Sequence, residues 1–302
     1  MLTADQIAHF QRDGFLVLDE VVPAAIRDAV EVEYAGLVYE MAARLGIDWR
    51  GGVLPTLRAV HDAGHDWFQP LDISLPGSRI VPDTPFHYGP AVHALLTCDA
   101  ILDIAAGLLG PRITSTPIQH LRIKPPQRTV AADAPAHITR TMWHQDRAVA
   151  HPEADATDMV TVWVAMTDAT EANGYLMVRP LAPGQPMLPH CPLEQTAIPD
   201  AHLDGDPVPL PVRAGGVVLL DPMIPHAARD NETEDCRWSF DLRYQRTGQP
   251  TGRAHFPDFA VRPGPPPDWR TVRDRWLDAR ARAAQAPHVP IHRWTSDSPH
   301  CA

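Results

Sequence analysis

The apolar residues of this chain follow a different spacing in its two main parts. Up to about residue 110 the spacing is mostly helical, with amphipathic segments at 3–13, 24–45 and 92–109. From Arg112 to Tyr244 short strand-like segments take over, and the clearest are 113–123, 159–166, 216–220 and 237–245. Helices followed by a block of strands predict a mainly β protein with helical cover, built on one antiparallel core.

Local signals divide the chain further. Thr3 and Gln6 form a capping-box pattern at the first helix, and Asp13-Gly14 ends that helix before a short strand at 15–18. Residues 50–90 have poor periodicity, so we expect a long loop, either a binding lid or a packed surface loop. We expect a single domain over 1–302, with a helical part (about 1–110), a core (about 111–261), and a C-terminal helix at 268–284 with a loose tail (about 262–302).

Composition narrows the classes of partner. The formal net charge of −11 argues against nucleic acid or an anionic membrane surface as the main partner. The N-terminus lacks a secretory signal, and we see no apolar run long enough to span a bilayer. Four widely spaced cysteines predict free thiols in a reducing cytoplasm: Cys98, Cys191, Cys236 and Cys301. We therefore expect a cytoplasmic protein that acts on a small molecule, and its oligomeric state stays open.

The triplet His144-Gln145-Asp146, taken with His226, predicts a metal site. Two imidazoles and one carboxylate can form a facial triad on Fe(II) and leave coordination positions open. His144 and Asp146 would point the same way from an extended segment, and His226 follows the predicted strand at 216–220. With 16 histidines, chance pairs are expected. The triplets at 202–204 and 151–153 lie in loop-like sequence, and we interpret them as false candidates.

The strand at 237–245 carries a second candidate feature. Arg237 and Ser239 share one face of this strand, and Trp238 and Phe240 share the other. A guanidinium and a hydroxyl on one face suit the carboxylate of a cosubstrate. Alternation alone favours a simpler interpretation, a polar face turned to solvent.

Taken in order, these residues resemble the phytanoyl-CoA dioxygenase family of Fe(II)/2-oxoglutarate-dependent oxygenases over about residues 1–262. The segments that carry the resemblance are 2–18, Leu121-Arg122-Ile123-Lys124-Pro125-Pro126, Trp143-His144-Gln145-Asp146, 162–174, Pro225-His226 with Asn231, and Arg237-Trp238-Ser239. The resemblance implies a double-stranded β-helix, or jelly-roll, core. It implies iron ligation by His144, Asp146 and His226, and binding of the 2-oxoglutarate C5 carboxylate by Arg237 and Ser239. It also implies a cosubstrate pocket lined by Gln145 and Trp163, with His120 as a further contact.

The resemblance also implies a reaction. We expect hydroxylation of an unactivated carbon in a small metabolite or natural product, with O2 and 2-oxoglutarate consumed and succinate and CO2 formed. Asp146 favours this outcome, because related halogenases carry a small residue at that position. Desaturation, epoxidation and ring closure use the same iron site and stay open. So do a zinc or nickel cupin-type enzyme and a non-catalytic metal-binding jelly-roll protein.

The substrate is the least constrained part of the prediction. Segments 127–142 and 178–184 depart from the family pattern and border the expected active-site mouth, so a coenzyme A ester does not follow from the family name. Four residues near the metal motif are candidate substrate contacts: His137, Trp143, Arg147 and Arg179. An arginine facing the pocket would imply an anionic group on the substrate, whereas the alternative is a solvated surface arginine.

Overall fold

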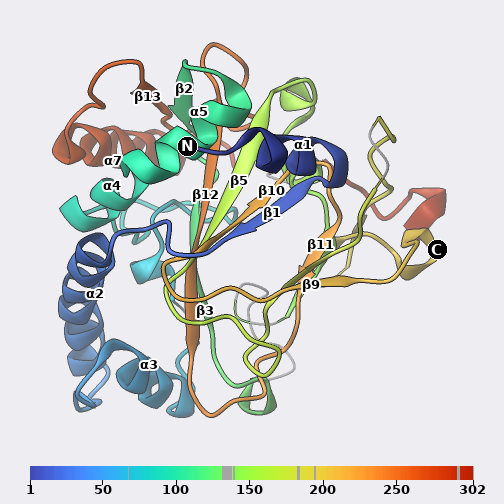
Figure 1. Ribbon diagram of the computed structural model, residues 1–302. Coiled ribbons are helices and arrows are strands. Elements are labelled where there is room, and N and C mark those ends of the chain that lie inside the picture. The colour runs from blue at the N-terminus through green and yellow to red at the C-terminus, as the bar shows by residue number, and fades with distance from the viewer. Residues whose placement is uncertain are drawn as a thin grey trace.

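The computed structural model describes residues 1–66, 68–130, 138, 140–181, 184–193, 195–290 and 293–301. It has three layers, in which helices cover one face of a large antiparallel sheet and a smaller sheet lies against the other face (Figure 1). This is the helix-covered β-core that the sequence predicts, and the two facing sheets form the jelly roll.

The helices gather mostly in the N-terminal part, as their spacing predicts. The capping box at Thr3 and Gln6 starts the first helix, and Gly14 ends it in the left-handed conformation, with φ 78°. Asp268 caps the last helix by accepting hydrogen bonds from the N–H groups of Arg270 and Thr271. The α-helices are α1 (Ala4–Asp13), α2 (Ala24–Arg44), α3 (Val53–Asp62), α4 (Pro90–Leu96), α5 (Asp99–Leu109), α6 (Asp146–Val149) and α7 (Trp269–Gln285). Short 3-10 turns are η1 (Gln69–Leu71), η2 (Gln127–Thr129), η3 (Pro152–Ala154), η4 (Asp200–His202) and η5 (Pro299–Cys301).

Antiparallel pairing joins the strands into the two main sheets. The large sheet has the order β1-β10-β5-β12-β2-β13, and β3 also pairs with the long strand β12. Its strands are β1 (Phe15–Leu18), β2 (Ile113–Ser115), β3 (His120–Lys124), β5 (Met159–Ala165), β10 (Val217–Leu220), β12 (Arg237–Arg246) and β13 (Phe259–Arg262). The small sheet has the order β4-β11-β6-β9, built from β4 (Thr141–His144), β6 (Leu176–Val178), β9 (Val208–Leu210) and β11 (His226–Ala228). A separate hairpin pairs β7 (Cys191–Pro192) with β8 (Thr196–Ala197).

Two hydrophobic cores follow from this layering. The larger core lies between the helices and the large sheet and includes Tyr34, Val162 and Phe240. The smaller core lies between the two sheets and includes Trp163 and Leu220. Neighbouring residues of β5 therefore serve different cores, because successive side chains of a strand point to opposite faces.

Three expectations about the N-terminal part need correction. Residues 50–90 are not one long loop, because α3 and η1 form within them. The helix expected at 92–109 is two helices, with a break at Thr97 and Cys98. The stretch Pro90–Leu109 is also long and apolar enough to span a membrane by length and composition, contrary to our expectation. Half of that stretch is buried inside the protein.

The cysteine prediction is wrong for two of the four residues. Cys191 and Cys301 form a disulfide across a sequence separation of 110 residues, whereas Cys98 and Cys236 are buried free thiols. The end of the chain is therefore tied to the β7 hairpin, and the loose tail that we expected is not seen over 293–301. Spacing along the sequence could not show this pairing, because the chain returns to the hairpin only through its tertiary course.

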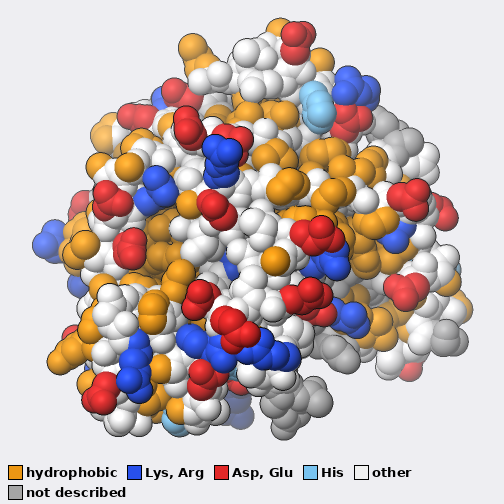
Figure 2. Space-filling model, turned by 60° about the horizontal axis from the view of Figure 1, so that its bottom comes forward, with side chains coloured by type: hydrophobic (Ala, Val, Ile, Leu, Met, Phe, Trp, Pro, Cys, Tyr) orange, Lys and Arg blue, Asp and Glu red, His pale blue; other side chains and the backbone are white. Residues whose placement is uncertain are grey.

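On the face shown in Figure 2, acidic and basic side chains are interspersed among hydrophobic and neutral ones rather than gathered by sign. A continuous basic surface of the kind that binds nucleic acid is not visible on this face.

Candidate metal centre

Two neighbouring strands of the small sheet bring the two predicted histidine ligands together. His144 ends β4 and pairs in register with His226, which begins β11. Their ring centroids are 4.2 Å apart. Asp146 begins α6, just beyond His144, and its Oδ1 lies 3.8 Å from His144 Nε2 and 3.9 Å from His226 Nε2. Ligand atoms of the three residues lie within 4.8 Å of one another, and in the described part of the chain no other His, Cys, Asp and Glu group does so.

Backbone carbonyls set the orientation of both imidazoles. His144 Nδ1 donates to Met142 O at 2.8 Å, and His226 Nδ1 donates to Ile224 O at 3.1 Å. Each ring therefore carries its lone pair on Nε2, the atom that faces Asp146. Burial, together with the nearby His226, lowers the pKa of His144 to about 3, so this imidazole is neutral and able to bind a metal at ordinary pH.

Asp146 is held from the large sheet. Arg243 Nη2 donates to Asp146 Oδ1, and Thr161 Oγ1 donates to Asp146 Oδ2. Arg243 and Thr161 are direct neighbours across β12 and β5. Burial alone would raise the pKa of Asp146, but Arg243 and the two histidines outweigh it and hold the pKa well below its usual range. The carboxylate is therefore ionised and fixed before any metal binds.

The face of β12 that carries Arg237 looks into the space between the sheets and not into solvent, so the simpler interpretation of this strand is wrong. Arg237 is 3% exposed and Ser239 is 0% exposed. Arg237 Nη1 donates to Gly174 O at 2.6 Å, and its guanidinium lies 5.1 Å from the ring centre of Trp163. Burial lowers the pKa of Arg237 to about 10, which leaves it charged at neutral pH.

The carbonyl of Gly174, which accepts the hydrogen bond from Arg237, is placed by a turn that depends on Asn173 and Gly174. Asn173 Oδ1 accepts the Thr170 N–H at 2.7 Å, and its amide donates to Asp168 O at 2.7 Å. Gly174 has a φ of 81°, and a Cβ there would overlap the carbonyl oxygen of Arg229. Only glycine fits this close approach.

Unpartnered polar atoms show that this site suits a small dicarboxylate. Arg237 Nε and Ser239 Oγ are both buried, and neither has a hydrogen-bond partner among the described residues. Buried hydrogen-bond donors rarely lack a partner in a folded protein with its ligands bound. A carboxylate is the acceptor that a guanidinium and a hydroxyl can share, and Arg237 lines the same cavity as His144 and His226. The residues therefore fit 2-oxoglutarate: Arg237 and Ser239 would hold one carboxylate, and the triad would hold the iron that binds the other end.

Three more charged residues line this cavity, and the sequence analysis gave none of them a role in the site. They are Arg122 and Lys124 on β3 and Asp241 on β12. Lys124, the only lysine of the chain, donates to Arg229 O, and burial together with Arg237 lowers its pKa. The alternation of β3 is the signal that could have found them, because Arg122 and Lys124 share a face and pair with Ser239 and Arg237 of β12.

The structure brings some of the expected cosubstrate residues to the cavity and leaves others apart. Trp163 lines the cavity beside Arg237. His120 of β3 pairs with Asp241 of β12. Its Nδ1, however, lies within hydrogen-bond distance of the Asp72 carboxylate, at 3.0 Å, and of the Ser74 hydroxyl, at 3.1 Å. Gln145 is fully buried and braces the backbone, since its side chain bonds Met223 O and the Leu188 N–H.

The candidate substrate contacts are also placed. Arg147 Nη1 donates to the carbonyls of Ala154 at 2.7 Å and Thr157 at 2.6 Å. Arg179 lies over the Trp143 ring at 5.0 Å, so two candidates contact each other, and neither is among the residues that line the metal cavity. His137 lies outside the described residues. The other HxD and HxE histidines also lie elsewhere: His202 lies against His300, and His151 contacts Pro290 O.

Comparison with solved structures supports this geometry at the level of the fold. The non-heme monooxygenase ThoJ, in its apo form, aligns with a TM-score of 0.60 and 18% identity, over 93% of this chain and 99% of its own. The epimerase SnoN, in complex with Fe3+, alpha ketoglutarate and nogalamycin RO, aligns with a TM-score of 0.53 and 20% identity, over 83% of this chain and 87% of its own.

Comparison of the sequence identifies the family. A search among curated proteins finds no match. The model of the phytanoyl-CoA dioxygenase (PhyH) family matches residues 10–239, a span that holds the three metal-binding residues as well as Arg237 and Ser239. The chain therefore belongs to the phytanoyl-CoA dioxygenase family of iron- and 2-oxoglutarate-dependent oxygenases.

Proposed function

We propose that this protein hydroxylates an unactivated carbon of a small metabolite or natural product, with 2-oxoglutarate and O2 as cosubstrates and succinate and CO2 as coproducts. The carrying observation is one cavity that joins the cluster of His144, Asp146 and His226 to Arg237. Intact Asp146 supports oxygen transfer, because a halide would need the position that its carboxylate fills.

The residues of the chain divide the work of this reaction. His144, Asp146 and His226 would hold Fe(II), which supplies the activation of O2 when bound. Arg237 and Ser239 would bind the far carboxylate of 2-oxoglutarate and so fix its orientation. Trp163 lies beside Arg237 and would keep water from the ion pair between Arg237 and the bound carboxylate. Arg243 and Thr161 keep the Asp146 carboxylate in place throughout.

Other oxidative outcomes stay open on the same site. Desaturation, epoxidation, ring closure and, by likeness to SnoN, epimerisation would all use the same iron-binding residues. Arg147 donates to backbone carbonyls, and Arg179 lies over the Trp143 ring. Neither arginine therefore supports an anionic group on the substrate. A cytoplasmic location stays a prediction, although the Cys191–Cys301 bond is more usual in an oxidising compartment.

Anaerobic titration tests the proposal. Fe(II) followed by 2-oxoglutarate should give a weak visible charge-transfer band in the wild type, and O2 should then release succinate. His144→Ala should abolish both signals. His202→Ala is the matched control, because it alters the other HxD triplet and should leave both signals intact.

Each result decides one part of the proposal. Absence of the band in the wild type would contradict the cosubstrate site. A band without succinate release, in a screen of candidate substrates, would favour a non-catalytic binding protein. Mass spectrometry of the product would separate hydroxylation, which adds one oxygen atom, from desaturation, which removes two hydrogens.

A further inference from the structure

The C-terminal end of the chain lies on the segment that carries two of the iron ligands. Trp294 Nε1 donates to Ala148 O at 2.9 Å. Arg293 pairs with Asp155 at 2.6 Å. Ala148 belongs to α6, the short helix that Asp146 begins. This tail (residues 293–301) therefore contacts the backbone just after a metal-binding residue, and it lies wholly beyond the residues matched by the family model.

A buried histidine connects the tail to the residue between the two ligands. His190 is 0% exposed, and the Trp294 ring stacks on it with centroids 5.1 Å apart and planes at 26°. His190 Nδ1 donates to Leu188 O at 2.8 Å, so its Nε2 is free to accept the Gln145 N–H at 3.0 Å. His190 thus holds the backbone of the HxD motif through one fixed tautomer.

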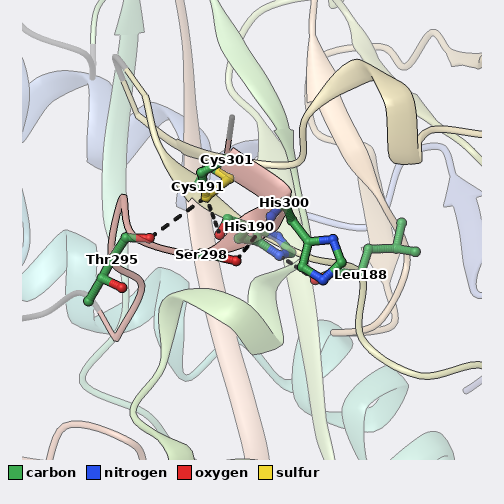
Figure 3. The surroundings of a disulfide bond; sticks show 7 residues. All are labelled: Leu188, His190, Cys191, Thr295, Ser298, His300 and Cys301. Carbon is green, nitrogen blue, oxygen red and sulfur yellow. Dashed lines mark hydrogen bonds between the residues drawn. A yellow bond between two sulfur atoms is a disulfide. The ribbon is translucent and has the colours of Figure 1, made fainter.

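The disulfide closes this arrangement covalently. Cys191 follows His190 directly, and its bond to Cys301 fixes the end of the tail beside it. Figure 3 shows Ser298 and His300 of the tail near His190 and the disulfide. Without this bond the tail keeps only non-covalent contacts. They include the Arg293–Asp155 pair, in which Arg293 is 10% and Asp155 47% exposed, and the hydrogen bond from Trp294 to Ala148 O. A partly exposed ion pair and single hydrogen bonds hold a segment more weakly than a covalent link.

We propose that His190 is a positioning residue of the iron site, and that the tail locked by the Cys191–Cys301 bond keeps His190 in place. The proposal rests on the iron site of the proposed function and adds a redox-sensitive support to it. Reduction of the disulfide would release the tail, loosen the contact of His190 with Gln145, and weaken iron binding without touching a ligand.

The expected size follows from the general effect of residues that orient metal ligands. Loss of such support typically weakens metal binding 10- to 100-fold. His190 acts through the backbone of Gln145 and not on a ligand directly, so we expect the lower end, about tenfold for removal of the imidazole. Reduction leaves the imidazole present, and we expect roughly threefold.

The first experiment measures Fe(II) affinity with the disulfide intact and reduced. A water-soluble trialkylphosphine reduces the bond: the two sulfurs gain two electrons and two protons, and the phosphine takes the oxygen of water to become its oxide. The reagent is removed by gel filtration before anaerobic titration. Wild type should bind Fe(II) about threefold more weakly after reduction. Cys301→Ser should match the reduced wild type and should not respond to the phosphine.

The second experiment separates positioning from general loss of stability. His190→Leu removes the acceptor for the Gln145 N–H and should weaken Fe(II) binding about tenfold, whereas His190→Gln keeps an acceptor and should recover part of the affinity. In His190→Leu, reduction should have no further effect, because the tail acts through His190. Cys98→Ala, at a buried free thiol, is the matched control and should keep the full response to reduction.

The outcomes distinguish this proposal from the proposed function. If the wild type bound no Fe(II), the iron site itself would be contradicted. If it bound Fe(II) and gave the 2-oxoglutarate band equally well before and after reduction and in Cys301→Ser, only the role of the tail would fall. Effects of reduction and of His190→Leu that simply added would also overturn it. Should His190→Leu not fold, Cys301→Ser and the reduced wild type still decide the matter.

Discussion

Both faces of strand β12 are largely buried, yet they do different work. Phe240 on one face and Ser239 on the other are both 0% exposed. The face with Trp238, Phe240, Leu242 and Tyr244 packs into the core beneath the helices. The face with Arg237, Ser239, Asp241 and Arg243 looks into the space between the sheets. Burial of apolar surface stabilises the fold at once, whereas buried polar groups need partners, and here iron or a cosubstrate can supply them.

The polar face itself divides into two kinds of residue. Arg243 forms an ion pair inside the protein with the carboxylate of Asp146, although its Nε has no partner among the described residues. Arg237 donates to Gly174 O but forms no ion pair among the described residues, and Ser239 Oγ has no hydrogen-bond partner there. The charge of Arg243 is therefore paired in the folded protein, whereas Arg237 and Ser239 can still accept a ligand carboxylate. Four substitutions along β12 test the contrast between its two faces and the contrast between Arg243 and the pair Arg237 and Ser239.

The largest effect should come from Arg237→Met. Two charge-assisted hydrogen bonds to a carboxylate are worth about 1.5–3 kcal/mol each, so the affinity for 2-oxoglutarate should fall by roughly a hundredfold or more. Titration of the charge-transfer band in the Fe(II) protein measures this. Arg237→Lys keeps the positive charge but loses the forked guanidinium, so its affinity for 2-oxoglutarate should lie between those of the wild type and Arg237→Met. An unchanged 2-oxoglutarate affinity in Arg237→Met would place the cosubstrate elsewhere.

On the apolar face, Phe240→Ala should lower the free energy of unfolding by about 3–5 kcal/mol, because it leaves a cavity in the larger core. Urea unfolding followed by circular dichroism measures the loss. The affinities of the folded variant for Fe(II) and 2-oxoglutarate should stay within about twofold of the wild-type values. Leu242→Ala, on the same face, should behave in the same way. A selective loss of cosubstrate binding would show that the two faces are not independent.

Arg243→Met should destabilise the protein without metal by about 3 kcal/mol, since it leaves the Asp146 carboxylate buried and unpaired. Fe(II) is an alternative cation for that carboxylate. Anaerobic addition of Fe(II) should therefore raise the melting temperature of Arg243→Met by more than it raises that of the wild type. An equal rise in both proteins would mean that Arg243 does not act on Asp146.

The smallest effect should come from Ser239→Ala. Loss of one hydrogen bond to a carboxylate should weaken 2-oxoglutarate binding by roughly tenfold, about 1.4 kcal/mol. Without ligand the variant should be at least as stable as the wild type, because Ser239 Oγ has no partner to lose among the described residues. Thermal unfolding with and without 2-oxoglutarate separates the two effects. A clear loss of stability in the ligand-free protein would show that the hydroxyl is already paired.

Much of the fold could be predicted from local pattern. The capping box at Thr3, the strand at 159–166 and the helix at 268–284 rest on short-range signals, and the structure contains each element. From the sequence we expect a loop at 50–90, although Val53, Leu57 and Val60 follow helical spacing within it. Its helix α3 begins at a glycine without a side-chain cap, and its stability comes largely from packing against α2.

The candidate site shows the same division. The types of His144, Asp146 and His226 predict a metal site, and the family resemblance adds iron and 2-oxoglutarate with Arg237 and Ser239. Alternation of β12 shows which residues share a face, but it does not show which face meets solvent. A strand with one apolar and one polar face has the same pattern on a protein surface and on the wall of a polar cavity.

The sequence by itself determined the family and the candidate metal ligands, because residue types and their order along the chain can be compared without the fold. Only the tertiary structure decided which partners those groups meet. The pairing of Arg243 with Asp146, the contact of His190 with the backbone of Gln145, and the Cys191–Cys301 bond all join residues that are distant along the chain. Such contacts depend on how two sheets and a returning tail pack together, and no spacing within one segment can encode them.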